Sequence, residues 1–274
     1  MRTKIGLKFF FFFILCFVAQ YAYSAFEDNN NAVLEGVSSF YNFSPSHYFQ
    51  DKSVIFASSG SRLYSMSECN LVHTGFLLSF SSFFAGTDIS FFGSSLYNEM
   101  TIDGLFLAGR SNLFGVNIKF MKLGIEGYSS TFYLGNDFLF ISQNDFFNFQ
   151  AIYNNAISYG YRYESEKPVS KFTSLVKIYP AEWNSLNIQI SYTRLGGTIF
   201  EMGSGARLSS VLSAGVGFSL VSRSIYTNFI FSLGRFDLSY DISIHPELGL
   251  THSVGIIYAG FKNISKNILE QKGS

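Results

Sequence analysis

The chain has 274 residues, of which 19% are aromatic and only 14% are charged, and its 19 basic residues balance 19 acidic ones. A disordered chain is charge-rich and poor in aromatics, and a disulfide scaffold needs more than two cysteines, so the composition excludes both classes. A chain without net positive charge is also not expected to have nucleic acid as a partner. So little charge in an apolar chain indicates either a large buried core or a membrane setting.

The first 24 residues have the order of parts of a secretory signal peptide. Basic residues within 1–8 precede an apolar stretch at 9–19, and the small residues Ala22 and Ser24 suit a cut before Ala25. The apolar stretch is too short to cross a bilayer, which takes about 20 residues. An uncleaved anchor and a lipid-bearing cysteine stay open as alternatives. We therefore predict that residues 1–24 are a cleaved signal peptide.

No stretch after residue 24 is predicted to form a transmembrane helix. The longest uncharged apolar run, 71–87, contains a histidine, several serines and two glycines, and such polar content opposes insertion. Because every backbone polar group must be satisfied within the protein in lipid, the remaining spanning structure is a closed β-barrel.

Six windows of the sequence alternate apolar and polar residues with a period of two, as strands do. The clearest runs from Leu186 to Thr193, where Leu, Ile and Tyr oppose Asn, Gln, Ser and Thr. Both soluble and membrane barrels alternate, but the first points its apolar face inward and the second outward. The signal peptide and the aromatics at strand ends favour the membrane version. The other five windows lie at 114–121, 156–163, 212–219, 235–244 and 254–258.

The spacing of turn signals sets the size of the barrel. A strand with its connection takes about 18 residues, so the part of the chain after residue 24 holds about 14 strands, within a range of about 10 to 14. We therefore predict an all-β fold, a single antiparallel transmembrane β-barrel over residues 51–261. Residues 25–50 alternate little and are a candidate plug of the lumen, and 262–274 are expected to form a periplasmic tail.

One turn near the C-terminus carries a family likeness. Its residues follow the order H-P-x-L-G-x-T-H, with Ser253 next where a basic residue is usual. With its flanking segment 236–261, this turn resembles the last hairpin of barrels related to the FadL fatty-acid transporters, above all the PorV/PorQ-like branch and related spirochaetal barrels. The resemblance implies about 14 strands and roles that range from moving hydrophobic molecules to holding substrates for a secretion system. The motif residues are His245, Pro246, Leu248, Gly249, Thr251 and His252.

The sequence shows no constellation for catalysis, a metal or a cofactor. His245, Glu247 and His252 match no zinc spacing, and we expect the two histidines to serve as turn caps and strand-end hydrogen-bond partners. No G-x-S-x-G elbow occurs, and Cys69 is alone once residues 1–24 are removed. We therefore expect no enzyme activity, no cofactor and no metal, and assign no role to Cys69.

Four charged residues fall on the polar faces of the predicted strands: Lys119, Arg235, Asp237 and Asp241. In a lumen they would either set the field and selectivity or pair with opposite charges, and pairing is the usual fate of buried charges.

These observations predict an exported, monomeric outer-membrane barrel of a Gram-negative or other diderm bacterium, surrounded by lipid. The first hypothesis for its role is a passive transporter of small hydrophobic molecules, and an apolar patch among lumen-facing residues would favour it. The alternative is a non-transporting barrel that docks or shuttles a periplasmic or surface protein, which a blocked lumen and a large loop surface would favour. A third hypothesis, a soluble exported β-protein, requires an apolar face that points inward.

Overall fold

The structure of the protein, a computed structural model, describes residues 54–66, 69–80, 82–144, 146–160, 169–181, 183–194 and 196–260. The predicted signal peptide, plug segment and C-terminal tail lie outside these residues. No helix in the described residues is long and apolar enough to cross a membrane. The elements are β1 (Val54–Arg62), η3 (Leu63–Ser65), β2 (Asn70–Phe80), β3 (Phe83–Gly93), β4 (Tyr97–Gly109), β5 (Asn112–Ile125), β6 (Thr131–Gln143), β7 (Phe147–Tyr159), β8 (Lys171–Ala181), β9 (Asn184–Thr193), β10 (Gly197–Arg207), β11 (Leu212–Ser219), β12 (Ile225–Leu233), β13 (Phe236–His245) and β14 (Gly249–Gly260).

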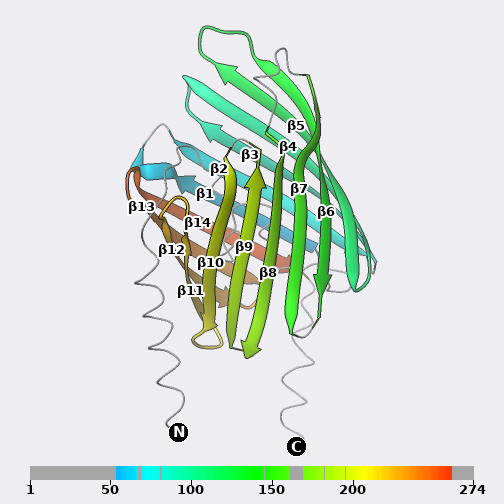
Figure 1. Cartoon of the computed structure of the whole chain (residues 1–274), viewed down its shortest axis with the longest axis vertical. Helices are drawn as coiled ribbons and strands as arrows, with labels where there is room; N and C mark the ends of the chain where they lie inside the picture. The colour runs from blue at the N-terminus through cyan, green and yellow to red at the C-terminus, as the bar shows by residue number, and fades with distance from the viewer. Residues whose placement is uncertain are drawn as a thin grey trace, which may run out of the picture.

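The fourteen strands form one closed antiparallel barrel in which each strand pairs with its neighbours in the sequence (Figure 1). The barrel closes where β1 pairs with β14, with Val54 opposite Gly260 and Arg62 opposite His252. Closure leaves no strand edge unpaired, as a backbone in lipid requires. The predicted fold class and the predicted number of about 14 strands are confirmed.

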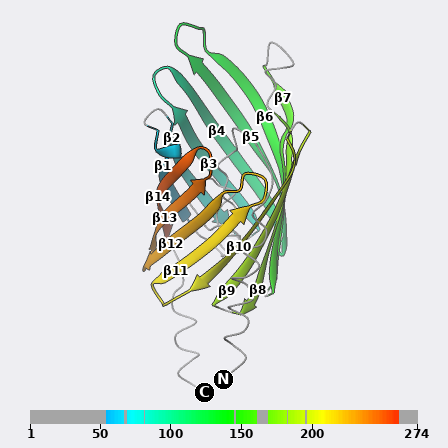
Figure 2. The same cartoon turned by 60° about the vertical axis from the view of Figure 1, so that its left-hand side comes forward.

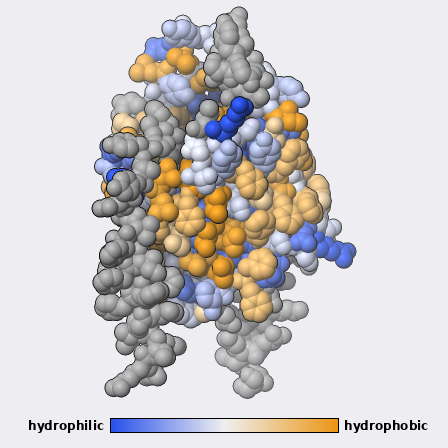
Figure 3. All heavy atoms as spheres, in the orientation of Figure 1, coloured by the Kyte–Doolittle hydropathy of each residue, from blue (hydrophilic) through white to orange (hydrophobic). Residues whose placement is uncertain are grey.

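The apolar faces of the strands point outward and the polar faces inward. Along β9, Ile190 and Tyr192 are exposed while Gln189 and Ser191 are buried, and the described residues of the other alternating windows show the same orientation. Figure 3 shows the hydrophobic side chains gathered over the middle of the strands on one face. A soluble barrel has the opposite orientation, so the soluble β-protein hypothesis is wrong. Exposed apolar residues include Phe56, Phe76, Ile89, Phe106, Phe114, Ile118, Phe138, Phe172, Phe229, Leu238 and Ile256.

The connections at the two ends of the barrel differ in length. One end, here called the short-turn end, carries the connections 81–82, 110–111, 144–146, 182–183, 208–211 and 234–235, together with Val54 and Gly260. The other, the long-loop end, carries 63–69, 94–96, 126–130, 160–170, 194–196, 220–224 and 246–248. The long strands β4–β7 rise highest at the long-loop end, so the wall is uneven (Figure 2). Outer-membrane barrels have short periplasmic turns and longer outer loops, and this barrel shows the same asymmetry.

Two β-bulges interrupt the regular pairing. Between β6 and β7 the register shifts after Asn136, and Asn155 takes a positive φ of 49°. The Asn155 backbone N–H donates to Asp137 Oδ1 at 2.8 Å, so a buried carboxylate holds the bulged chain in place. Between β8 and β9 a second shift follows Ile178 and lies next to Pro180, which cannot donate a ladder hydrogen bond.

Candidate functional site

One part of the barrel interior is lined by apolar side chains. We call it the apolar inner layer, and it covers the short-turn half of the inner wall from β14 through β1 to β7. Ile55, Leu77 and Leu113 in this layer have no exposed surface. Such residues break the rule of a polar lumen, because their strands carry apolar side chains on both faces. The layer consists of Ile55, Ala57, Leu77, Phe84, Leu105, Leu107, Leu113, Leu139, Ile141 and Ile152, with Ile257 packed against them.

A group of charged and amide side chains lies directly above this layer, toward the long-loop end. We call it the acidic wall cluster: Asp88, Asp103, Asn117, Lys119 and Asp137. The strand register brings these residues together, because Asp88 is opposite Asp103 and Asp103 is opposite Lys119. On each of the four strands β3–β6, the residues of the apolar inner layer lie nearer the short-turn end than the residues of the acidic wall cluster.

Hydrogen bonds and one ion pair connect the acidic wall cluster. Lys119 Nζ lies 2.9 Å from Asp137 Oδ2, and the Asp137 side chain has no exposed surface. Asn117 Nδ2 donates to Asp103 Oδ1 at 2.9 Å and to Asp137 Oδ2 at 3.2 Å. At the edge of the cluster, His73 Nδ1 lies 3.8 Å from Asp88 Oδ2. The cluster holds three carboxylates against one lysine, with His73 at its edge, so carboxylates outnumber basic groups on this side of the lumen.

The opposite inner wall, formed by β8–β13, is mostly polar, with Leu175 of β8 among its buried residues. Gln189 Nε2 donates to Glu201 Oε2 at 2.5 Å, and Tyr226 donates its hydroxyl hydrogen to Glu201 Oε1 at 3.4 Å. The hydroxyls of Thr173 and Ser191 share a hydrogen bond of 3.1 Å. The interior therefore has two different walls. One is apolar toward the short-turn end and acidic toward the long-loop end, and the other is lined mainly with amides and hydroxyls.

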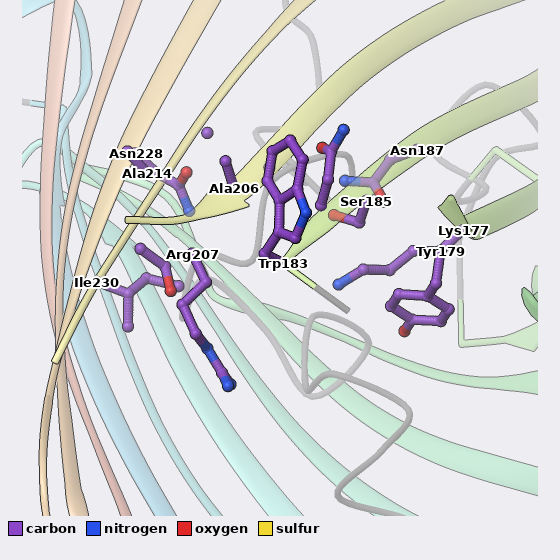
Figure 4. Close-up of a pocket in the computed structure, with 14 residues that line it drawn as sticks. Lys177, Tyr179, Trp183, Ser185, Asn187, Ala206, Arg207, Ala214, Asn228 and Ile230 are labelled. Atoms are coloured by element: carbon purple, nitrogen blue, oxygen red, sulfur yellow. The ribbon is translucent and has the colours of Figure 1, made fainter. Parts of the chain in front are cut away.

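The polar wall contains a cavity of about 150 Å³ at the short-turn end, which we call the short-turn pocket. Lys177 and Tyr179 of β8, Trp183 of the following turn and Arg207 at the end of β10 lie around it (Figure 4). In Figure 4 the Lys177 side chain extends toward the middle of the pocket, near Ser185.

An apolar groove of about 390 Å³ lies on the other side of the barrel. Its lining combines outward-facing rings, such as Phe106 and Phe114, with Leu107 and Leu139 of the apolar inner layer. Gly115 lies between them, and a Cβ there would be 2.1 Å from Leu107 Cδ2. The missing side chain thus lets the apolar inner layer approach the outer surface of the wall.

The family-like turn lies at the long-loop end, between β13 and β14. His245 Nδ1 accepts hydrogen bonds from the backbone N–H groups of Glu247 at 3.2 Å and Leu248 at 3.1 Å, so the expected turn cap is present. His252 points outward and its Nδ1 lies 2.8 Å from the Tyr240 hydroxyl. The two histidines therefore lie on opposite faces of the wall. The other motif residues lie as follows: Pro246 and Leu248 in the turn, Gly249 at a positive φ of 97°, and Thr251 accepting from the Tyr64 backbone N–H at 3.0 Å.

The structure separates the four charges that alternation assigned to polar faces. Lys119 is in the acidic wall cluster, whereas Asp237 and Asp241 lie on the inner face of β13 across the barrel. Arg235 lies in the turn before β13 and is exposed, so the alternation of this window begins one residue later, at Phe236.

No period-two pattern in the sequence marks the apolar inner layer, the short-turn pocket or most of the acidic wall cluster. The segments Leu105–Ala108 and Phe138–Ile141 are apolar on both faces, so they have no period of two to detect. The signal that could have identified these two segments is a run of four consecutive apolar residues within a barrel strand. The half-buried Cys69 is a free thiol, and within the described residues no three His, Cys, Asp or Glu side chains are grouped to hold a metal.

Neither protein-family models nor curated protein sequences give a match to this chain. Solved structures do resemble it in fold. A TodX deletion mutant described as a monoaromatic hydrocarbon channel superposes with a TM-score of 0.57, at 7% identity, over 85% of this chain and 94% of that one. The Pseudomonas putida toluene transporter TodX gives a TM-score of 0.54 at 7% identity, over 87% and 95% of the two chains.

The outer membrane protein Omp33 of Acinetobacter baumannii is also similar, with a TM-score of 0.50 at 7% identity over 77% of this chain and 99% of that one. At such low identity these likenesses establish the architecture alone. The chain folds as the barrels of bacterial outer-membrane channels do.

Proposed function

We propose that this chain is an outer-membrane β-barrel through which small hydrophobic molecules cross passively. The apolar inner layer is the observation that carries the proposal. A barrel for polar solutes has a polar lumen, whereas this barrel packs Leu, Ile and Phe on its inner face. A hydrophobic solute that enters between these side chains, which are 0–6% exposed, would bury its apolar surface there. The solute would be held without a cofactor and without a covalent step.

The apolar groove extends this surface toward the lipid. Leu107 and Leu139 belong both to the apolar inner layer and to the groove lining, and Leu107 packs closely over Gly115 of the neighbouring strand. A hydrophobic solute would therefore find apolar contacts from the interior to the outer face of β4–β6. The likeness in fold to a hydrocarbon channel and a toluene transporter supports this role.

The same proposal includes how the chain is placed in the cell. Residues 1–24 would be removed on export, the short-turn end would face the periplasm, and the barrel would act as a monomer in the outer membrane. Residues 25–50 would form a lumen plug. Residues 262–274 would form a periplasmic tail.

The turn at His245–His252 supports a relation to the PorV/PorQ-like branch, in which some barrels serve secretion systems. A relation to this branch would favour the alternative role, in which the barrel docks or shuttles a periplasmic or surface protein. The apolar inner layer favours transport over docking, because a docking barrel has no need of a hydrophobic lumen wall.

An uptake assay tests the proposal. Proteoliposomes containing the barrel should take up radiolabelled toluene faster than empty ones and show no such gain for glucose. Leu105→Asn places an amide in the apolar inner layer and should slow toluene uptake about fivefold, since an amide without partners is costly in an apolar site. The matched control Ser191→Asn adds the same amide to the polar wall and should leave uptake unchanged.

Fractionation and gel mobility provide the check on the barrel itself. The unboiled protein should migrate differently from the boiled protein in detergent, and each variant should keep this shift. Recovery in the soluble fraction with no mobility shift would refute the membrane assignment. A membrane-inserted barrel with no toluene uptake above empty vesicles would refute transport while leaving the docking role.

A further inference from the structure

Asp241 is a carboxylate on the inner wall that has no opposite charge beside it. It lies on the inner face of β13, and its buried Oδ1 atom has no hydrogen-bond partner within the described residues. The ion pairs of this part of the chain involve Lys119 and His73 on other strands. The four strands β11–β14 contain no lysine or arginine. Because a buried charge is normally paired, this carboxylate is a binding group for a cation.

The wall next to Asp241 presents small hydroxyl groups. One row nearer the short-turn end, Ser239 of β13, Gly255 of β14 and Ser59 of β1 lie side by side in the strand register. Ser239 is 4% and Ser59 6% exposed, and the Oγ of each has no hydrogen-bond partner among the described residues. Gly255 between them has no side chain. This row therefore offers two hydroxyls and no large side chain beside the carboxylate.

The apolar inner layer begins in the following row. There Ile257 of β14 is opposite Ala57 of β1; Ala57 belongs to the layer and Ile257 packs against it. A strand rises about 3.3 Å per residue, so this row is about 13 Å from Asp241 along the wall. The wall thus changes from a carboxylate through hydroxyls to apolar side chains within the length of a small molecule.

An organic ammonium group suits this site better than a metal ion. Calcium takes about six to eight oxygen ligands, several of them from carboxylates. Within the described residues, no three His, Cys, Asp or Glu side chains are grouped in that way. A primary ammonium group has three donors, which match the Asp241 carboxylate and the neighbouring Ser239 hydroxyl.

We propose that the inner face of β13 and β14 binds an amphipathic primary amine. The ammonium group pairs with Asp241 and donates to the Ser239 hydroxyl, and the apolar part of the molecule packs on Ile257 and Ala57. The inference rests on the proposed function, because it names a class of hydrophobic solute that the same lumen accepts.

Calorimetric titration tests the site. The barrel in detergent micelles is titrated with 4-phenylbutylamine, and the heats measured with empty micelles are subtracted. The alcohol 4-phenylbutanol keeps the ring and chain without the charge, and butylamine keeps the charge without the ring. The amine 4-phenylbutylamine should bind saturably, and each analogue should bind about tenfold more weakly, since each lacks one of the two kinds of contact.

Variants assign the binding to Asp241. Asp241→Asn should weaken binding of 4-phenylbutylamine about tenfold and abolish its advantage over the alcohol, whereas Asp241→Glu should keep that advantage. The matched control Glu247→Gln removes a carboxylate from the exposed turn that follows the same strand, and should leave the affinity unchanged. The gel mobility shift of each variant confirms that it has folded.

Three results would overturn the inference. They are a titration with 4-phenylbutylamine that does not saturate, equal binding of the amine and the alcohol, and an unchanged advantage of the amine in Asp241→Asn. Toluene carries no charge, so Asp241→Asn should still take it up. Absent amine binding with normal toluene uptake therefore refutes this inference alone, whereas absence of both also refutes the proposed transport.

Discussion

Asp137 forms a 2.9 Å ion pair with Lys119 through Oδ2, and its Oδ1 accepts a 2.8 Å hydrogen bond from the backbone N–H of Asn155 in the β7 bulge. One fully buried carboxylate therefore joins the acidic wall cluster to the strand that departs from regular pairing. Without Asp137 the bulged backbone would lose a hydrogen-bond acceptor and Lys119 its opposite charge.

Asp137→Asn should destabilise the barrel by about 3 kcal/mol, because it removes the carboxylate that lies 2.9 Å from the Lys119 ammonium group. Urea unfolding in detergent micelles, followed by gel mobility, measures the change. Lys119→Met leaves the fully buried Asp137 carboxylate without its ion-pair partner and should cost a similar amount, and the double variant should cost less than the two single changes together. Equal stability of Asp137→Asn and the unchanged protein would show that the pair is not structural.

The outward orientation of β5 predicts the effect of charge at Ile118, which is 48% exposed in the middle of the strand. Ile118→Arg should destabilise the barrel in lipid vesicles by about 2–4 kcal/mol, the cost of a basic side chain near the bilayer centre. Ile118→Leu is the matched control and should change little. If Ile118→Arg instead folds with unchanged stability, this face of the barrel does not lie in lipid.

The close approach of β4 and β5 predicts that Gly115 tolerates no side chain. A Cβ at this position would lie 2.1 Å from Leu107 Cδ2 and 2.6 Å from the Phe106 carbonyl oxygen. Gly115→Ala should therefore cost about 1–3 kcal/mol through overpacking. Gly60→Ala is the control, because nothing lies within 4 Å of a Cβ there. Unfolding midpoints of the two variants in the same detergent provide the comparison, and equal midpoints would count against the packing described.

The turn after β13 depends on the His245 side chain as an acceptor. His245→Ala leaves the N–H groups of Glu247 and Leu248 without this partner and should cost about 1 kcal/mol. Amide hydrogen exchange should accelerate at these two positions. His245→Asn, which keeps an acceptor near the backbone, should preserve much of the protection. His252→Ala should leave both amides unaffected, because His252 contacts Tyr240 on the other face. Slow exchange in His245→Ala would exclude the capping role.

Much of the barrel follows from local sequence. A strand exposes its two faces at alternate residues wherever it lies, so the windows at 186–193 and 212–219 indicated strands and their two faces before any partner was known. The turn at His245 was also readable, because its residues are neighbours in the chain. The strand number followed from the spacing of turn signals, and the structure confirms it.

The tertiary structure decided which face meets lipid and what lines the interior. Alternation is the same in an inward and an outward arrangement, so the exposure of Ile190 and the burial of Gln189 had to be observed. Leu105 and Phe106 are both apolar and differ only in the side of the wall they occupy, which depends on closure of the barrel. Lys177 and Arg207 line one pocket because β8, β9 and β10 are neighbours in the barrel. Composition and alternation are local properties, and they suffice to predict strands with one apolar and one polar face. Closure of the barrel places part of the apolar content in the interior, because it brings strands that are apolar on both faces together.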